Sequence, residues 1–495
     1  MISRISLENF KGFGLLKNMN VRPITILCGP NGCGKSSLVQ SILLMKQSLE
    51  NHNPNQTVLL NGRLADLGKF EDIVFRKDSD KVISFRFSFD IDKTFLHNMA
   101  VMNGIMIDEM MPEEGIGDPK ADCRVHFKIS LKVTSDGIHY LRPILVNYYS
   151  LRFESIKPNG KVIPGGSFEM SFVKEDTYSV KWKDVKFASR VMGATEEVSD
   201  GELFARIGFA NISPRLLVTD VPSRFIDLSI LSEAGDVIKA VFNTYNYIGS
   251  LREKPLRRYI YEDATVEIGV RGENAAYICL TEQNSRLDSH YFYDKERETF
   301  ILKKNIRLGE SLQEWLNIMD IKNFSTEMIN EIIYLNLDSG LTGQTRVNIA
   351  DAGSVVNQVF PILLEGLRMP RRHTLILDHP ELHLYPNLQM RMADFFVATA
   401  LSGKQVIAET HSNHLINRLV RRIVEDQTHR LRDLIAICFM KPSENGMVFE
   451  EVKIDETRGI LNSPEGFFDD IQSEQQRIMR AGLDKRRKMR ERKKG

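Results

Sequence analysis

Apolar and polar side chains repeat with two different periods along this chain, and the changes of period mark its elements. Residues 4–10 (RISLENF) alternate at every second position, which is typical of a half-buried strand, and residues 22–30 (RPITILCGP) form an apolar run that enters a glycine-rich turn. Beyond the turn, apolar residues recur at helical spacing through residues 38–49. This order predicts a strand, a tight loop and a helix.

The middle of the chain is rich in strand-like alternation. The segments that show it most clearly are residues 82–91, 124–133 and 145–156. Their β-branched and aromatic residues at alternate positions predict an antiparallel sheet. Residues 202–246 and 311–335, in contrast, have the character of largely helical segments.

The last third of the chain predicts a parallel sheet. Residues 373–379 (HTLILDH), 405–411 (QVIAETH) and 433–441 (DLIAICFMK) are short apolar runs, and the segments 387–401 and 412–426 between them have helical periodicity. The order β-α-β-α-β is that of parallel strands covered by helices. The strand, loop and helix near residue 30 and the strand near residue 375 are expected to belong to the same sheet. This fold is therefore split in the sequence, and the chain between its two parts is inserted into it.

Composition is that of an ordinary globular protein and excludes several classes. With 495 residues, of which 42% are hydrophobic and 26% charged, we expect two or three folded units. No run of roughly 18 apolar residues is long enough to span a membrane, and the amino terminus lacks the features of an export signal. The five cysteines are scattered, which argues against a disulfide framework or a zinc site. We therefore expect a cytoplasmic protein without a membrane partner.

Charge is unevenly placed although the formal net charge is only +1. Between Arg477 and Lys494, ten basic residues stand against two acidic ones. Such a tail suits neutralisation of nucleic-acid phosphates, and DNA is therefore a candidate ligand. A solvated, frayed basic end is the alternative.

The glycine-rich turn carries the most specific motif. Residues 29–36 match G-x-x-x-x-G-K-[ST], in which glycines let backbone amides face phosphate oxygens, the lysine reaches the β and γ phosphates and the hydroxyl faces Mg²⁺. The strand before and the helix after supply the context that the motif needs. The predicted ATP-binding residues are Gly29, Pro30, Asn31, Gly32, Cys33, Gly34, Lys35, Ser36 and Ser37.

A metal-binding acid is expected at the end of a buried strand. Asp378 ends the apolar run HTLILD and is predicted to hold Mg²⁺ together with Ser36. An aspartate after a short apolar run is common by itself, and its significance here comes from the phosphate loop.

The motifs together resemble a known family. ISLENFKGF, PITILCGPNGCGKSS, LILDHPELHLYP and VIAETHS look like the ABC-type ATPase heads of the SMC, RecF and OLD group. A bacterial AAA branch of this group is similar in further islands, YIGSLREKP (247–255) and PEGFFDD (464–470). The resemblance implies an α/β fold, a split ABC-type P-loop ATPase head with a mixed sheet and helices. Members recur in anti-phage operons beside nucleases, including the Septu and retron systems.

The resemblance also implies roles for further residues. Residues 351–363 (DAGSVVNQVFPIL) stand where the group has its signature segment, so that Gly353, Ser354 and Gln358 would act in trans on the nucleotide of a second subunit. An amphipathic helix start without such a role is the alternative. His411 matches the switch histidine that contacts the γ phosphate. A polar residue at a strand end without a ligand is the alternative there.

The catalytic base is open between two residues. The group has a glutamate directly after the metal-binding acid, and this chain has His379 there. Glu381, two residues further on, is our choice for the carboxylate that orients the attacking water. His379 in that role, or slow turnover, are the alternatives.

These expectations define an organisation and a function. Residues 1–80 and 246–460 would form the two parts of the ATPase head, residues 81–245 a β-rich and helical insertion, and residues 461–495 a segment with the basic tail. We expect MgATP to close a head-to-head homodimer or higher homo-oligomer that senses DNA or controls a separate effector nuclease. A nucleotide-binding scaffold with little turnover and a RecF-like DNA-repair ATPase are the alternatives.

Overall fold

The computed structural model describes most of the chain. The described residues are 1–53, 55–92, 95, 122–134, 143–157, 159–184, 187–191, 194–198, 200–219, 229–260, 267–338, 345–462, 464 and 479. Apart from Pro464 and Met479, the PEGFFDD segment and the basic tail lie outside them.

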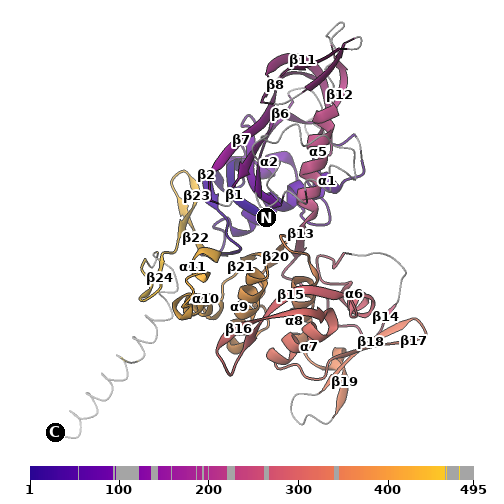
Figure 1. Cartoon of the computed structure of the whole chain (residues 1–495), viewed down its shortest axis with the longest axis vertical. Coiled ribbons are helices and arrows are strands. Elements are labelled where there is room, and N and C mark those ends of the chain that lie inside the picture. The colour runs from indigo at the N-terminus through magenta and orange to yellow at the C-terminus, as the bar shows by residue number, and fades with distance from the viewer. Residues whose placement is uncertain are drawn as a thin grey trace, which may run out of the picture.

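Fifteen of the described strands form one continuous mixed sheet (Figure 1). Five neighbouring strands at one end of it are parallel. In sheet order they are β13 (Tyr245–Ile248), β20 (Thr374–Asp378), β21 (Gln405–Glu409), β3 (Ile24–Cys28) and β22 (Ile435–Ser443). The predicted split of the fold is confirmed, because β3 from the start of the chain lies between β21 and β22 from its last third.

The remaining ten strands continue the sheet in antiparallel fashion from β22. In sheet order they are β23 (Gly446–Glu451), β2 (Phe13–Asn20), β1 (Ile2–Phe10), β4 (Ile83–Asp92), β5 (Asp122–Val133), β6 (Ile144–Ile156), β7 (Val162–Lys174), β8 (Thr177–Lys183), β11 (Gly201–Ala210) and β12 (Ser213–Thr219). The β-rich middle of the chain is thus hydrogen-bonded to the amino-terminal strands through the pair β1–β4.

Smaller sheets and the helices complete the fold. The small sheets contain β9 (Phe187–Val191) with β10 (Ala194–Val198), β14 (Tyr259–Ile260) with β17 (Ser325–Ile329), β18 (Ile332–Asp338) and β19 (Arg346–Asn348), β15 (Arg286–Asp294) with β16 (Thr299–Arg307), and β24 (Ile454–Asp455) with β25 (Gly459–Ile460). The helices are α1 (Lys35–Glu50), α2 (Phe70–Ile73), α5 (Ser229–Asn243), α6 (Ala275–Glu282), α7 (Leu308–Ile318), α8 (Ser354–Arg368), α9 (Pro386–Leu401), α10 (Asn413–Glu425) and α11 (Leu431–Leu434), with 3₁₀ turns at Phe75–Lys77 and Ile349–Asp351. None of the described helices is long and apolar enough to cross a membrane.

The parallel strands are buried on both faces, which explains their unbroken apolar runs. On β20, Leu375 and Leu377 belong to the core beneath α6 to α10, and Ile376 between them belongs to the core shared by α1, α5 and the antiparallel strands. Successive side chains of a strand point to opposite faces, so one strand contributes to both cores. The predicted α/β class is confirmed.

Two expected helical segments are different in the structure. Most of the first half of residues 202–246 forms β11 and β12, and of the described residues in this segment those of α5 are helical. In residues 311–335, α7 ends at Ile318 and β17 and β18 follow. Both segments contain alternation that a helical interpretation overlooks, as in the buried Leu203, Ala205 and Ile207 of β11.

Candidate functional site

The glycine-rich loop lies at the carboxyl end of β3, where glycine is required by both space and backbone angle. Gly29 has φ +133°, and a Cβ added there would lie 2.3 Å from the carbonyl oxygen of Met440. Gly34 has φ +91° and leads directly into α1. The loop can therefore turn tightly enough to bring its amides to the start of a helix, where the helix dipole favours an anion.

Lys35 and Ser36 follow on the first turn of α1. The Lys35 ammonium is buried and donates to the carbonyl oxygens of Gly29 at 3.0 Å and Pro30 at 2.8 Å. The Ser36 hydroxyl donates to Oε1 of Glu409 at 3.0 Å, and the same oxygen lies 4.0 Å from Lys35 Nζ. The phosphate loop is thereby joined to the end of β21.

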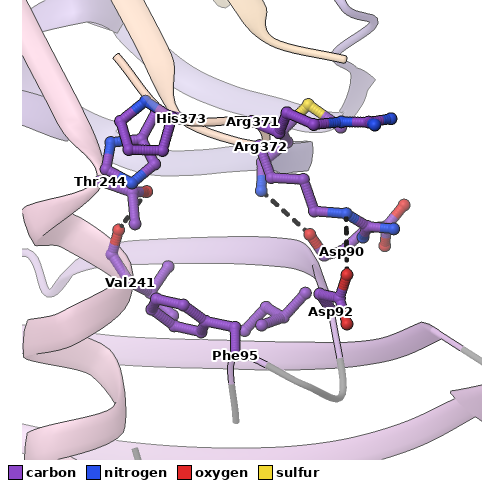
Figure 2. A pocket seen from close by; sticks show the side chains of 11 residues that line it. Asp90, Asp92, Phe95, Val241, Thr244, Arg371, Arg372 and His373 are labelled. Atoms are coloured by element: carbon purple, nitrogen blue, oxygen red, sulfur yellow. Dashed lines mark hydrogen bonds and ion pairs between the residues drawn. The ribbon is translucent and has the colours of Figure 1, made fainter. Parts of the chain in front are cut away.

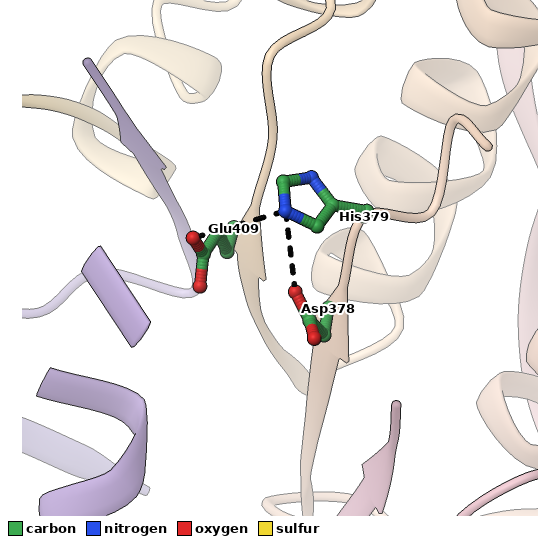
Figure 3. Close-up of side chains that lie close together, drawn as sticks. All are labelled: Asp378, His379 and Glu409. Atoms are coloured by element: carbon green, nitrogen blue, oxygen red, sulfur yellow. Dashed lines mark ion pairs between the residues drawn. The ribbon is translucent and has the colours of Figure 1, made fainter. Parts of the chain in front are cut away.

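Asp378 and Glu409 end neighbouring parallel strands in direct register, Asp378 on β20 and Glu409 on β21. His379 follows Asp378 with φ +45°, a left-handed angle that is uncommon for a residue other than glycine. Its Nε2 lies 3.6 Å from Asp378 Oδ1 and 3.9 Å from Glu409 Oε1 (Figure 3). The imidazole thus contacts both carboxylates.

Glu381 connects the two histidines. Its Oε1 accepts from the backbone N–H of His411 at 2.8 Å and lies 3.4 Å from Nδ1 of His379. The rings of His379 and His411 stack with centroids 5.1 Å apart and planes inclined by 12°. Three separate loops therefore meet at the carboxyl edge of the parallel strands, as is usual for ligand sites in such sheets.

Burial and these contacts shift the acid–base properties of the cluster. Burial raises the pKa of Glu409. Burial also acts to raise the pKa of Glu381, but the hydrogen bonds with His379 and the His411 N–H outweigh it and leave that pKa lowered. The bond to Glu381 raises the pKa of His379, whereas burial lowers the pKa of His411. The two stacked histidines are therefore biased towards different protonation states.

Arg252 lies behind this cluster and was not expected to be part of it. The guanidinium is 7% exposed and donates to the backbone oxygens of Asp378 at 3.0 Å and His379 at 2.9 Å. It also donates to the Gln358 side chain at 3.1 Å. Burial lowers the pKa of Arg252 to about 10, so that it stays charged at neutral pH. Arg252 thereby holds the turn after β20 and helix α8 together.

In the expected signature segment, Gln358 is buried and Gly353 is exposed. Gln358 on α8 faces Arg252 of the same chain and is buried. Ser354 is the first residue of α8, and Gly353 before it has φ +82° with open space where a Cβ would be. The backbone directly before the helix is therefore exposed at Gly353.

The site residues predicted from the sequence are largely brought together. Lys35, Ser36, Asp378, His379, Glu381 and His411 form one connected cluster through the contacts above. The sequence patterns did not single out Glu409 or Arg252 as residues of this site. Glu409 carried the same signal as Asp378, since it ends an apolar strand directly before Thr410 and His411.

The donor atoms of this cluster suit a magnesium nucleotide. The Ser36 hydroxyl and the carboxylates of Asp378 and Glu409 are hard oxygen donors, which Mg²⁺ prefers. The Lys35 ammonium now donates hydrogen bonds to two loop carbonyls, and the oxygens of a polyphosphate would replace them as its acceptors. The residues present fit both groups.

A separate cavity of about 550 Å³ lies at the amino ends of β13 and β20 (Figure 2). Figure 2 shows Arg372 beside Asp92, and the same guanidinium bonds Asp122 at 2.8 Å. Burial lowers the pKa of His373 in its wall to about 4. The cavity contains none of the cluster residues and is at the opposite end of the strands.

Comparisons with known proteins agree with the motifs. A family model described as an AAA ATPase domain matches residues 1–185 and 275–416, which is more than half of the chain. No curated protein matches.

Among solved structures, an SMC head bound to the C-terminal winged-helix domain of ScpA has 9% identity and a TM-score of 0.43, covering 92% of this chain and 98% of that one. The SMC head domain from Thermotoga maritima has 11% identity and a TM-score of 0.36, with 92% and 99% covered. A Pyrococcus furiosus SMC head with an extended coiled coil, bound to the C-terminal domain of ScpA, has 8% identity and a TM-score of 0.35, with 91% and 96% covered.

Proposed function

The chain belongs to the AAA ATPase domain family, and from this premise we propose that it binds and hydrolyses MgATP at the carboxyl edge of its parallel strands. The observation that carries the proposal is the convergence of Lys35, Asp378 and His411, which are far apart in the sequence. A glycine-rich turn without a ligand would not need an ammonium and a strand-end acid beside it.

Binding would use groups that are already placed. The loop amides and Lys35 would hold the β and γ phosphates, with the ammonium exchanging the carbonyls of Gly29 and Pro30 for phosphate oxygens. Ser36 and Asp378 would hold Mg²⁺, which supplies neutralisation of the charge on the phosphates. Glu409 would release the Ser36 hydroxyl for this purpose, because that hydroxyl now donates to it.

Hydrolysis would depend on Glu381. Its lowered pKa keeps the carboxylate ionised, and the hydrogen bond from the His411 N–H fixes its position. An ionised, fixed carboxylate can orient a water molecule and accept its proton. His411, beside it, would contact the γ phosphate and report its loss. His379 would hold Glu381 through Nδ1.

We further propose that nucleotide binding joins two copies of the chain head to head. The exposed Gly353 directly before α8 supports this, since a second copy could approach the start of that helix and receive its γ phosphate there. The closure would act as a switch for a separate effector nuclease or for DNA, in anti-phage defence, as the resemblance of the motifs implies. A cytoplasmic location belongs to the same proposal.

A second candidate function is a nucleotide-dependent scaffold with little turnover. The specific observation in its favour is His379 at the position where related ATPases have a glutamate. Here the protein would bind MgATP and close, but cleave it rarely.

Phosphate release by the purified chain tests the proposal. Lys35→Ala should abolish ATP binding and release, whereas Lys17→Ala, an exposed lysine on β2, should leave both unchanged. Glu381→Gln should retain binding and lose release. Hydrolysis that survives Lys35→Ala would refute the proposal, and tight binding with hardly any turnover by the unmodified chain would favour the scaffold.

A further inference from the structure

His379 has the environment of a metal ligand. Its Nε2 faces the carboxylates of Asp378 and Glu409, and one donor atom from each of the three residues lies within 4.8 Å of the others (Figure 3). The register between β20 and β21 places the two carboxylates side by side, and the left-handed turn at His379 brings the ring to them. Backbone geometry, more than flexible side chains, creates the cluster.

The other ring nitrogen is held as metal-binding histidines usually are. Nδ1 of His379 lies 3.4 Å from Oε1 of Glu381, and the His411 N–H fixes that oxygen at 2.8 Å. In protein metal sites, a carboxylate on the far nitrogen commonly orients the ligating imidazole and increases its basicity. The stacked His411 ring restricts His379 further.

The spacing requires an adjustment of less than about 1 Å. Nε2 lies 3.6 Å from Asp378 Oδ1 and 3.9 Å from Glu409 Oε1. Ligand atoms around a cation that binds each at about 2.1 Å are roughly 3.0–3.4 Å apart. Rotation of the two carboxylates would have to shorten these distances by about 0.2–0.6 Å and about 0.5–0.9 Å.

We propose that Asp378, His379 and Glu409 form a binding site for a divalent transition-metal ion that is occupied without nucleotide. The imidazole distinguishes this site from an all-oxygen magnesium site, because Mg²⁺ prefers oxygen ligands and keeps its waters, whereas imidazole favours ions of the Mn²⁺ to Zn²⁺ series. The site shares Asp378 with the proposed nucleotide-bound Mg²⁺, but it uses His379 and Glu409 in place of Ser36. The nucleotide-free site does not rest on ATP hydrolysis.

Titration of the nucleotide-free, EDTA-treated full chain with Mn²⁺ tests the site. The electron paramagnetic resonance signal of free Mn²⁺ should decrease by one equivalent per chain. His379→Gln and Glu409→Gln should each weaken binding about tenfold or more, and Glu381→Gln, through loss of orientation, by about 10–100-fold. His414→Gln, an exposed histidine on α10, should bind Mn²⁺ like the unmodified chain.

The controls keep the outcomes distinct. Thermal melting of each variant identifies any that fail to fold. If either His379→Gln or Glu409→Gln does not fold, the other still tests the site. Mg²⁺ should compete for Mn²⁺ only in large excess, and His379→Glu, which makes the site all-oxygen, should reduce that preference. No Mn²⁺ binding by the unmodified chain, or equal binding by folded His379→Gln, would overturn the proposal. ATP binding with Mg²⁺, measured separately, reports on the proposed function alone.

Discussion

Replacement of Arg252 by methionine should destabilise the chain strongly, because it removes the charge that joins α8 to the end of β20. Methionine keeps most of the apolar stem, but the backbone oxygens of Asp378 and His379 and the side chain of Gln358 lose their donor. The guanidinium is buried, so water does not readily replace it.

The magnitude follows from two opposed contributions. Hydrogen bonds from a charged group contribute about 1.5–3 kcal/mol each, so three of them give roughly 5–9 kcal/mol. Returning the buried guanidinium to water in the unfolded state recovers several kcal/mol of this. We expect a net loss of about 3 kcal/mol, which lowers the melting temperature by roughly 3–5 °C, because an unfolding unit of about 300–495 residues has an unfolding entropy of about 0.6–1.0 kcal/mol/K.

Thermal unfolding at pH 7 measures the effect. Arg258→Met, a nearby exposed arginine, is the matched control and should change the melting temperature by about 1 °C or less. Arg252→Lys keeps the charge with fewer directed donors and should give an intermediate value. If Arg252→Met melts within about 1 °C of the unmodified chain, the joining role of this arginine is refuted.

Further expectations concern the loop, the base and a buried histidine. Gly29→Ala should abolish ATP binding in an equilibrium titration, because its Cβ would meet Met440 O at 2.3 Å. Gly32→Ala has open space but the left-handed φ of +74°, so it should weaken binding through backbone strain alone and by less than Gly29→Ala. If Glu381 is the base, Glu381→Gln should trap bound ATP in a single-turnover assay, while unchanged cleavage would transfer the role to His379 or Glu409. His290 is fully buried, and burial lowers its pKa well below the ordinary value, so protons bind preferentially to the unfolded chain below pH 6.5. Its contribution to stability should therefore fall by up to about 1.4 kcal/mol per pH unit as the pH drops below 6.5, and His290→Phe should flatten the decrease in melting temperature over pH 6.5–5. An equally steep decrease in that variant would contradict this reasoning.

The parallel part of the fold could be predicted because its signals are local. Strands buried on both faces have unbroken apolar runs, and β20 and β21 each end in a polar residue where the site begins. Lys35, Asp378 and His411 could be assigned to one site for the same reason, since the carboxyl ends of neighbouring parallel strands meet at one edge.

Other features depend on tertiary contacts that no local pattern encodes. Arg252 is surrounded by exposed residues in its own segment, and only the packing of α8 against the end of β20 buries it. The role of Arg252 therefore could not be predicted from the sequence. Leu203, Ala205 and Ile207 of β11 do alternate. The glycines and charged residues of the same segment have low strand propensity, however, so the sequence does not clearly favour a strand over a helix there.

A structure of the chain with Mg²⁺ and a non-hydrolysable ATP analogue would locate the nucleotide itself. We expect the triphosphate on the loop of residues 29–36, its metal ion between Ser36 and Asp378, and its γ phosphate facing Glu381 and His411. Nucleotide bound elsewhere, for example in the cavity beside Arg371 and His373, with Lys35 still on the carbonyls of Gly29 and Pro30, would contradict it.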